Sequence, residues 1–336
     1  MRLTITILTL VAISSAATAA DAHFAMAWQG YVEDTIATPR QPDCVPRMYA
    51  ANPAVERRGA VVMFHGFGGC PQQFFEVAEI VSAAGFDVLL PLSPGHGMVP
   101  AADGTEDLSR VPDGATWTRY AEFAARMNDI MAKSSGTKVV VGFSLGGAMA
   151  LHAALRSPER YDRMLLLAPM LAIAGGGFVS GAVEVLGRTP GVREMTVKPF
   201  GIRDECKRWT EAGRAGFCDY RLDHTVALVE IGDRNDELLA DTELPMRVQI
   251  IGAGDEKYVS NGKMDELANG EAERENISLC FLPEDVPHEM LTRYENVGRE
   301  MYWLEGLLGR VAGFIAAGEP VPVTRPGESG SPKCRL

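Results

Sequence analysis

The chain has 336 residues, of which 46% are hydrophobic and 23% are charged. This composition is typical of a globular protein with a sizeable core, built as one large α/β domain with an insertion or as two domains. The formal net charge of -12 argues against nucleic acid or an anionic membrane surface as the main partner, because both favour clustered lysine and arginine.

Residues 1–19 predict a secretory signal peptide. Arg2 supplies a basic start, residues 3–13 form an apolar run, and Ala17-Thr18-Ala19 reads as an A-x-A cleavage site. The apolar run is too short for a transmembrane helix, and no later stretch is long and apolar enough to span a bilayer. We therefore expect an exported protein, periplasmic or extracellular, without an integral membrane segment.

Strands and helices alternate along the chain, which predicts a mostly parallel sheet with helices on both faces. The predicted elements are strands at 60–64, 86–91, 138–143, 163–168, 247–251 and 277–282, and helices at 71–84, 117–133, 145–156 and 289–317. The alternation breaks between the fourth and fifth of these strands. We therefore predict an α/β core formed by residues 20–171 and 245–317, with an inserted cap of residues 172–244. Residues 318–336 are rich in Pro, Gly and Ser and predict a tail, unless Cys334 ties them down.

Residues 142–146 read Gly-Phe-Ser-Leu-Gly and match the G-x-S-x-G motif. A valine-rich strand is predicted before the motif and a helix of small residues after it, which is the context of a nucleophile elbow. On such a strained turn the neighbouring side chains must be small, and the serine hydroxyl is raised to a helix N-terminus. This context favours Ser144 as a catalytic nucleophile over the alternative, a glycine-rich turn with a surface serine.

A serine hydroxyl needs a base, and in elbow hydrolases the chain order is serine, acid, histidine. His288 follows the last predicted strand, where a loop can place its imidazole over the strand ends to accept the Ser144 proton. Asp255 follows the strand at 247–251 and would hold the His288 tautomer. Other carboxylates are interpreted as solvated charge or as weaker rivals: Glu256, Asp233, Asp236 and Asp285. Two other histidines after Ser144 are predicted to lie away from the elbow: His152 in the helix and His224 in the cap.

Residues 65–69 (His-Gly-Phe-Gly-Gly) follow the first predicted strand. Small residues there let the backbone approach a reacting carbonyl group. The backbone N–H groups of Phe67 and Leu145 would then form an oxyanion hole. His65 precedes Ser144 in the chain, so we interpret it as a structural histidine that braces this loop.

Six cysteines follow the predicted cleavage site, and an even number in an exported chain suggests disulfides. Six cysteines allow 15 complete pairings, and free buried thiols are a further alternative. Cys206 and Cys218 lie in one polar segment and close a short loop, which favours their pairing. The remaining pairs are taken as Cys44 with Cys70 and Cys280 with Cys334. None of the six has zinc-ligand spacing, so no metal site is expected.

The segments HGFGG, PLSPGHG, GFSLGG, GAGD and PHEML occur in this order and resemble the α/β-hydrolase superfamily. The chain is most similar to the branch of monoacylglycerol lipases, lysophospholipases and serine aminopeptidases, over residues 58–317. The resemblance implies an α/β-hydrolase fold with the cap after its sixth strand, hydrolysis through an acyl-enzyme without metal or organic cofactor, and a structural role for His96. Tyr258 departs from the family pattern, which has an apolar residue three places after the acid, and Cys70 is also atypical.

Two functions from this branch remain open. The first is hydrolysis of lipid-like or small acyl esters, with residues 170–186 of the cap lining an acyl pocket or serving as ordinary core. The second is an exopeptidase, which needs carboxylates facing the substrate amine, for which Glu205 and Glu211 are available. A dehalogenase or epoxide hydrolase would have Asp in place of Ser144. An inactive binding module would not need the triad residue types in this order.

Overall fold

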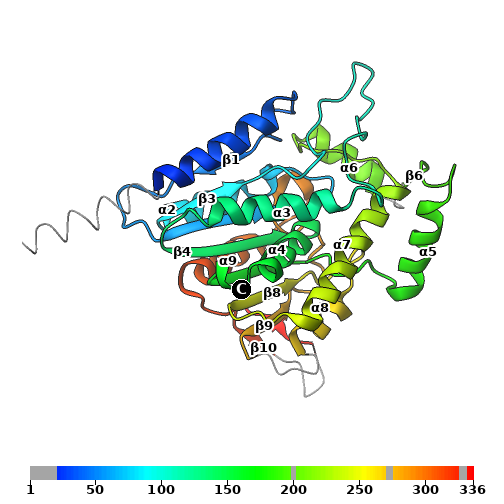
Figure 1. Ribbon diagram of the computed structural model, residues 1–336. Helices are drawn as coiled ribbons and strands as arrows, with labels where there is room; N and C mark the ends of the chain where they lie inside the picture. The colour runs from blue at the N-terminus through cyan, green and yellow to red at the C-terminus, as the bar shows by residue number, and fades with distance from the viewer. Residues whose placement is uncertain (1–20, 198–201, 270–274, 325–330) are drawn as a thin grey trace, which may run out of the picture.

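The computed structural model describes residues 21–197, 202–269, 275–324 and 331–336, so the predicted signal peptide lies outside the described residues. A nine-stranded sheet in the order β1-β3-β2-β4-β5-β8-β9-β11-β10 forms the centre of the molecule (Figure 1). Its strands are β1 (Arg47–Tyr49), β2 (Gly59–Phe64), β3 (Phe86–Leu90), β4 (Thr137–Phe143), β5 (Arg163–Leu167), β8 (Arg247–Gly252), β9 (Ile277–Phe281), β10 (Val323–Thr324) and β11 (Lys333–Cys334). The strands from β3 to β9 are parallel to one another, and β1 and β10 are antiparallel to their neighbours. The predicted mostly parallel sheet is therefore confirmed.

The central strands are almost entirely buried, as their continuous apolar sequences predict for a sheet covered on both faces. β4 pairs with β2 up to Gly142 opposite Phe64, and with β5 up to Phe143 opposite Leu167. This register brings the residue after β4 and the loop after β2 to the same carboxyl edge of the sheet. Ligand sites of open α/β sheets lie at this edge.

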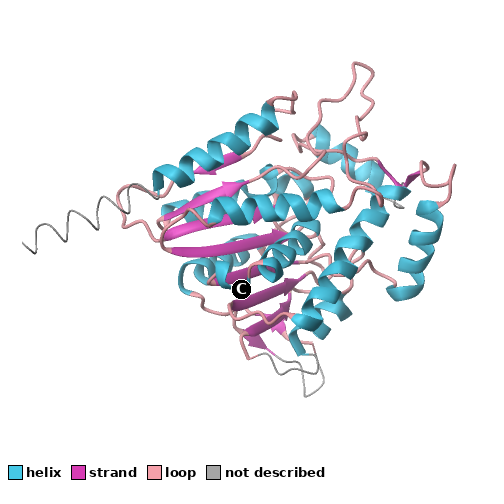
Figure 2. Cartoon of the chain, in the orientation of Figure 1, coloured by secondary structure: helices cyan, strands magenta, loops and turns pink. Residues whose placement is uncertain are grey.

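Helices cover both faces of the sheet, and each face has its own apolar cluster. The first cluster contains apolar side chains from four helices: one at residues 21–36, α3 (Thr118–Met131), α4 (Leu145–Arg156) and α8 (Asn261–Asn269). The second cluster contains apolar side chains from the 3-10 helix η1 (Pro71–Phe74), α2 (Phe75–Ala83) and α9 (Leu304–Ala317). Figure 2 shows the strands lying between these two layers.

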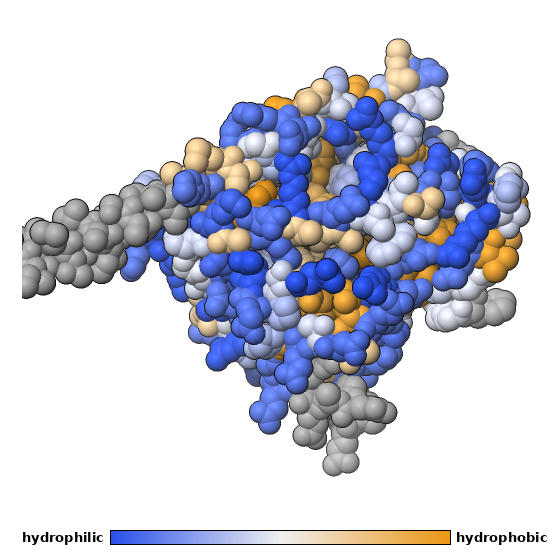
Figure 3. All heavy atoms as spheres, in the orientation of Figure 1, coloured by the Kyte–Doolittle hydropathy of each residue, from blue (hydrophilic) through white to orange (hydrophobic). Residues whose placement is uncertain are grey.

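The cap lies between β5 and β8 and comprises α5 (Gly176–Arg188), β6 (Thr196–Val197), α6 (Ile202–Glu211), β7 (Tyr220–Arg221) and α7 (Leu222–Asp241). The cap was expected after the sixth strand, but in the described chain it follows the fifth, β5. Among the described residues, only the short strand β1 precedes β2. β6 and β7 pair as a small antiparallel sheet. The surface facing the viewer in Figure 3 is mostly hydrophilic, and apolar atoms show at its right side, where α5 exposes Val185 and Leu186.

The last helix is shorter than the sequence predicts, since α9 begins at Leu304 rather than at residue 289. Residues 289–303 instead form a loop that contains the 3-10 helix η3 (Arg293–Glu295). The Asn296 side chain donates hydrogen bonds to the carbonyl oxygens of Glu289 at 2.6 Å and Thr292 at 3.0 Å. Such side-chain bonds to the local backbone compete with helix formation.

Three disulfides link the pairs expected from the sequence: Cys44–Cys70, Cys206–Cys218 and Cys280–Cys334. Cys280 lies in β9 and Cys334 in β11, which pairs with β9 at Lys333 opposite Phe281. The C-terminal segment is thereby tied to the edge of the sheet instead of forming a free tail. In the described part of the chain, no helix has the length and apolar character needed to cross a membrane.

Candidate active site

Ser144 lies on a strained turn between β4 and α4. Its backbone φ of 54° and ψ of -121° fall where residues with a Cβ are rare. A Cβ at Gly142 would lie 2.1 Å from the carbonyl oxygen of Gly146, and one at Gly146 would lie 1.9 Å from that of Phe64. Glycine is therefore required on both sides of the serine, and the turn has the geometry of a nucleophile elbow.

The loop after β2 passes directly beside Ser144, since a Cβ at Gly66 would lie 3.3 Å from the Ser144 Cβ. Phe67 and Ser144 line one cavity. Leu145 is the first residue of α4, and the first N–H groups of a helix have no partner within it. Phe67 and Leu145, the two residues expected to form an oxyanion hole, thus both lie next to the serine.

Two buried histidines fix this loop. His65 donates from Nδ1 to the Gly66 carbonyl at 2.9 Å and accepts at Nε2 from the Ser93 N–H at 3.0 Å. His96 accepts at Nε2 from the Gly68 N–H at 3.3 Å. Burial lowers the pKa of His65 to about 4 and lowers that of His96 as well, so both rings are neutral at pH 7. Their contacts are those of bracing residues.

A buried polar network joins the cap to the same loop. Arg214, between α6 and β7, donates to the Glu295 carboxylate at 2.8 Å and to the Gly68 carbonyl at 3.0 Å. Gln73 donates to Glu295 at 2.9 Å and accepts from the Gly66 N–H at 2.8 Å. The Arg214 and Glu295 side chains are only 7% and 2% exposed. No local sequence pattern predicts this network, because its members come from three distant segments.

His288 is held by Glu256 and not by Asp255, which corrects the expectation from the sequence. The distance from His288 Nδ1 to Glu256 Oε2 is 2.7 Å, and the Glu256 side chain is 2% exposed. The other oxygen, Oε1, accepts from the backbone N–H groups of Tyr258 at 2.9 Å and Val259 at 3.1 Å. The Asp255 side chain is 39% exposed and pairs with Lys257 at 2.9 Å.

Glu256 takes the place expected for Asp255 because of how the backbone is paired beside His288. The backbone after β8 aligns with the segment before His288 through Asp255, whose N–H donates to the Val286 carbonyl at 2.9 Å and which bridges to Pro287. Its side chain is then directed outward to Lys257, and that of the next residue reaches the imidazole. The sequence contained one signal for this shift, since the apolar residue expected three places after the acid is Val259, three places after Glu256.

The environment of His288 favours its charged form. Burial lowers its pKa, but the hydrogen bond and negative charge of Glu256, together with the charges of Glu289 and Glu295, outweigh burial and raise the pKa above 6.5. The ring packs on Phe143, with centroids 5.1 Å apart. His152 and His224 do not join the site: His152 lies 2.9 Å from the Asn235 carboxamide, and His224 accepts from the Arg221 N–H at 3.2 Å.

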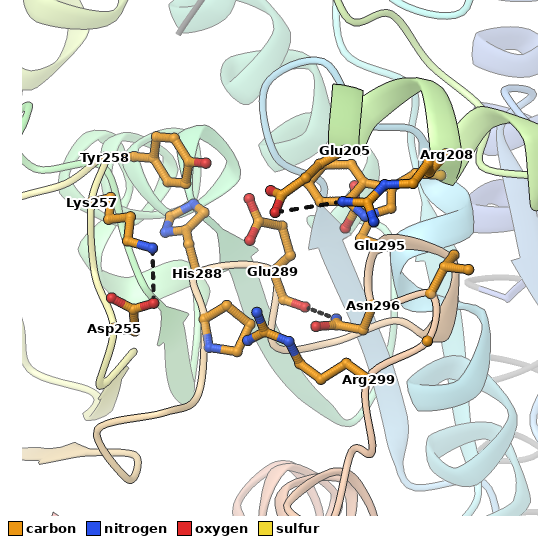
Figure 4. A pocket seen from close by; sticks show the side chains of 14 residues that line it. Glu205, Arg208, Asp255, Lys257, Tyr258, His288, Glu289, Glu295, Asn296 and Arg299 are labelled. Carbon is orange, nitrogen blue, oxygen red and sulfur yellow. Dashed lines mark hydrogen bonds and ion pairs between the residues drawn. The ribbon is translucent and has the colours of Figure 1, made fainter. Parts of the chain in front are cut away.

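Two neighbouring cavities meet at His288. The first, here called the apolar cavity, has a volume of about 340 Å³ and contains Ser144, Phe67 and His288. Its other walls are largely apolar: Met170, Ile173, Val179, Val183, Phe217 and Leu228. The second, here called the polar cavity, has a volume of about 240 Å³ and is shown in Figure 4. Its walls include Glu205, Arg208, Asp255, Lys257, Glu289 and Glu295.

Comparisons with known proteins agree with this geometry. The family model described as the alpha/beta hydrolase fold matches residues 59–183. A pimeloyl-[acyl-carrier protein] methyl ester esterase of Aromatoleum aromaticum is 31% identical over 110 residues, which cover 33% of this chain and 37% of that protein. Lipase LipV of Mycobacterium tuberculosis is 38% identical over 66 residues, 20% of this chain and 25% of that one. The chain therefore matches well under two thirds of the length of either relative.

Among solved structures, a monoacylglycerol lipase of Paleococcus ferrophilus superposes with a TM-score of 0.62 at 16% identity. The superposition covers 82% of this chain and 98% of that one, which extends the likeness from the matched segment to most of the described fold. The sheet order, the strained turn at Ser144 and these comparisons agree. The chain has the α/β-hydrolase fold, and residues 59–183 match the family model of that fold.

Proposed function

We propose that the protein is a serine hydrolase that cleaves carboxylic esters through an acyl-enzyme formed on Ser144. The observation that carries the proposal is the hydrogen bond between His288 and Glu256, made beside a cavity that also contains the strained Ser144. The two relatives that match part of the chain are an esterase and a lipase by name, which supports the proposal.

In this mechanism the Glu256 carboxylate accepts from His288 Nδ1–H, so the proton stays on Nδ1 and Nε2 accepts the Ser144 proton. Ser144 Oγ then bonds to the ester carbonyl carbon, and the N–H groups of Phe67 and Leu145 stabilise the negative oxygen. The bond to the alcohol oxygen breaks, and His288 gives its proton to that oxygen. Water repeats the sequence and releases the acid. No step uses a metal or an organic cofactor.

The two cavities suggest how an ester is divided. The apolar cavity, which contains Ser144 and the residues assigned to the oxyanion hole, suits the acyl chain. The polar cavity adjoins the apolar cavity and shares with it His288, the residue that would protonate the leaving alcohol. The favoured substrate is therefore an ester of an apolar acid with a polar alcohol.

An exopeptidase is the second candidate, because carboxylates do line the polar cavity. Glu205 and Glu289 are on its wall, whereas Glu211 is exposed at the end of α6. An aminoacyl anilide distinguishes the two candidates. Turnover of the anilide but of no ester would favour the peptidase, and turnover of neither substrate would favour an inactive binding module.

The proposed chemistry is tested by labelling and mutation. A fluorophosphonate probe should modify Ser144, and the variants Ser144→Ala and His288→Ala should lower ester turnover by about 10³-fold or more. Ser109→Ala is the matched control, since Ser109 is exposed and lies outside both cavities. Near-normal turnover of Ser144→Ala would overturn the proposal.

Export is also proposed, on the basis of the signal-peptide pattern and the three disulfides, which form in oxidising compartments. Mass spectrometry of the protein expressed from its full coding sequence should show a mature chain that begins near residue 20. Retention of Met1 in the secreted fraction would contradict the proposal.

A further inference from the structure

Glu289 is an acidic residue on the wall of both cavities that has no role in the proposed mechanism. It follows His288 directly and lines both the apolar and the polar cavity. Figure 4 shows it beside His288, and no dashed line reaches its carboxyl group. Among the described residues, no side chain other than its own forms a hydrogen bond or salt bridge with this carboxyl group, whose one hydrogen bond is to the backbone of Glu289 itself.

The other carboxylates on the wall of the polar cavity each pair with a cation. The pairs are Asp255 with Lys257 at 2.9 Å, Glu295 with Arg214 at 2.8 Å and Glu205 with Arg208 at 3.9 Å. Glu289 is thus the one acidic wall residue, in the described part of this cavity, that has no cationic partner.

An ionised carboxyl group away from bulk water is unfavourable unless it is paired. Burial, together with the negative charges of Glu295 and Glu256, outweighs the opposing charge of His288 and raises the pKa of Glu289 to about 7. A bound cation would compensate this charge. A neutral hydrocarbon group of a substrate at the same place would leave the carboxylate charge uncompensated.

The side from which a cation would come follows from the two cavities. The acyl chain suits the apolar cavity, and the polar cavity is lined by His288 but not by Ser144. His288 protonates the leaving oxygen in the proposed mechanism, so the alcohol portion of the substrate lies next to His288 and its neighbour Glu289.

We propose that Glu289 determines substrate specificity by binding a cationic group on the leaving alcohol, so that esters of amino alcohols are the preferred substrate class. This inference rests on the proposed ester hydrolysis. Glu289 takes no part in bond making or breaking, and its contribution is an ion pair with the part of the substrate that leaves.

Three butyrate esters of matched shape test the proposal: those of choline, 2-(dimethylamino)ethanol and 3,3-dimethylbutanol. The first two alcohols are cationic at pH 7.5 and the third is their neutral counterpart. We expect kcat/KM of the wild-type protein to favour the cationic esters about tenfold or more, the range of one partly desolvated ion pair. In Glu289→Gln, which keeps the side-chain shape, the ratio of cationic to neutral kcat/KM should fall to about one.

Glu300→Gln is the matched control, because Glu300 is exposed and lines neither cavity. It should keep the wild-type ratio. A wild-type ratio near one, or a ratio that Glu289→Gln leaves unchanged, would overturn the inference. The inference would also be overturned if Glu289→Gln lowered the turnover of an aminoacyl anilide but not that of the cationic esters. The cation recognised by Glu289 would then lie on the acyl portion of the substrate. Failure of the proposed function is seen separately, as butyrate turnover that survives Ser144→Ala.

The dimethylamino and choline esters also separate charge from hydrogen bonding. Only the protonated dimethylamino group can donate to the carboxylate, whereas choline offers charge alone. Equal preference for both over the neutral ester supports an ion pair as the basis of recognition. A preference for the dimethylamino ester alone would contradict the proposed ion pair and assign the selectivity to hydrogen bonding.

Discussion

His288 Nδ1 and Glu256 Oε2 lie 2.7 Å apart, and Glu256 is fixed in that position by two backbone N–H groups at its other oxygen. The acid is therefore oriented before any substrate binds. Asp255, one residue earlier in the chain, is directed to Lys257 instead. This relationship reverses the expectation from the sequence, which favoured Asp255 over Glu256.

The exchange of acids predicts opposite outcomes for two neighbouring substitutions. Glu256→Gln should lower kcat by about 10³-fold to 10⁴-fold, because the His288 tautomer and the imidazolium lose their support. Asp255→Asn should cost no more than about fivefold, since it removes only a partly exposed ion pair. Steady-state kinetics on a neutral ester measures both. A larger loss in Asp255→Asn than in Glu256→Gln would restore Asp255 as the acid.

The pH profile should reflect the raised pKa of His288. His288 must be neutral to accept the Ser144 proton, so activity is lost as the pH falls through its pKa. Because that pKa is raised, the acid limb of kcat/KM should have its midpoint above 6.5. In Glu256→Gln the hydrogen bond and charge that raise the pKa are gone while burial, which lowers it, remains, so the midpoint should move to lower pH.

A neutral ester is the right substrate for this measurement, because Glu289, with a pKa of about 7, would add its own titration to the binding of a cationic ester. His65 does not contribute to the profile near neutrality, since burial lowers its pKa to about 4. A midpoint that is identical in the wild-type protein and in Glu256→Gln would show that another group controls the acid limb.

The buried ion pair between Arg214 of the cap and Glu295 of η3 predicts a large effect on stability. Arg214→Met leaves the buried Glu295 carboxylate without its cation and should lower the free energy of unfolding by about 3–5 kcal/mol in urea titrations. Arg208→Met, on the neighbouring helix α6, should cost about 1 kcal/mol or less, because its side chain is 65% exposed.

A second substitution identifies the cause. Adding Glu295→Gln to Arg214→Met removes the uncompensated charge, so the double variant should regain part of the lost stability. Strictly additive losses would indicate that the two side chains contribute independently and that their ion pair is not the source of the effect.

The apolar cavity predicts a change in acyl preference. Val183 of α5 lines this cavity, and Val183→Trp should fill part of it. We expect kcat/KM for a decanoate ester, relative to the acetate of the same alcohol, to fall about tenfold or more, the effect of losing a few buried methylene groups. Val185→Trp is the matched control, since Val185 lies on the same helix but is 69% exposed. Equal effects of the two substitutions would argue against this cavity as the acyl site.

Much of the fold could be predicted from the sequence. The strands of the parallel sheet, the elbow at Ser144 and the loop at 65–69 follow from local patterns, because apolar runs and glycines in a tight turn act within a few residues. Among the disulfides, only Cys206–Cys218 is favoured by a short spacing, since the other two pairs are 26 and 54 residues apart. The start of α9 could not be predicted in this way. Its apolar stripe is local, but the loop before it depends on side-chain bonds of Asn296.

The sequence by itself indicated that Ser144, the loop at 65–69 and His288 come together at one edge of a parallel sheet, since the strands and tight turns are encoded locally. Only the tertiary structure decided which acid supports His288, that Arg214 joins the cap to the loop, and that Glu289 is left unpaired between two cavities. Those outcomes depend on where long side chains point once distant segments pack. A rotation of the chain by one residue exchanges Asp255 for Glu256, and the position of Val259 is the one local signal for that rotation.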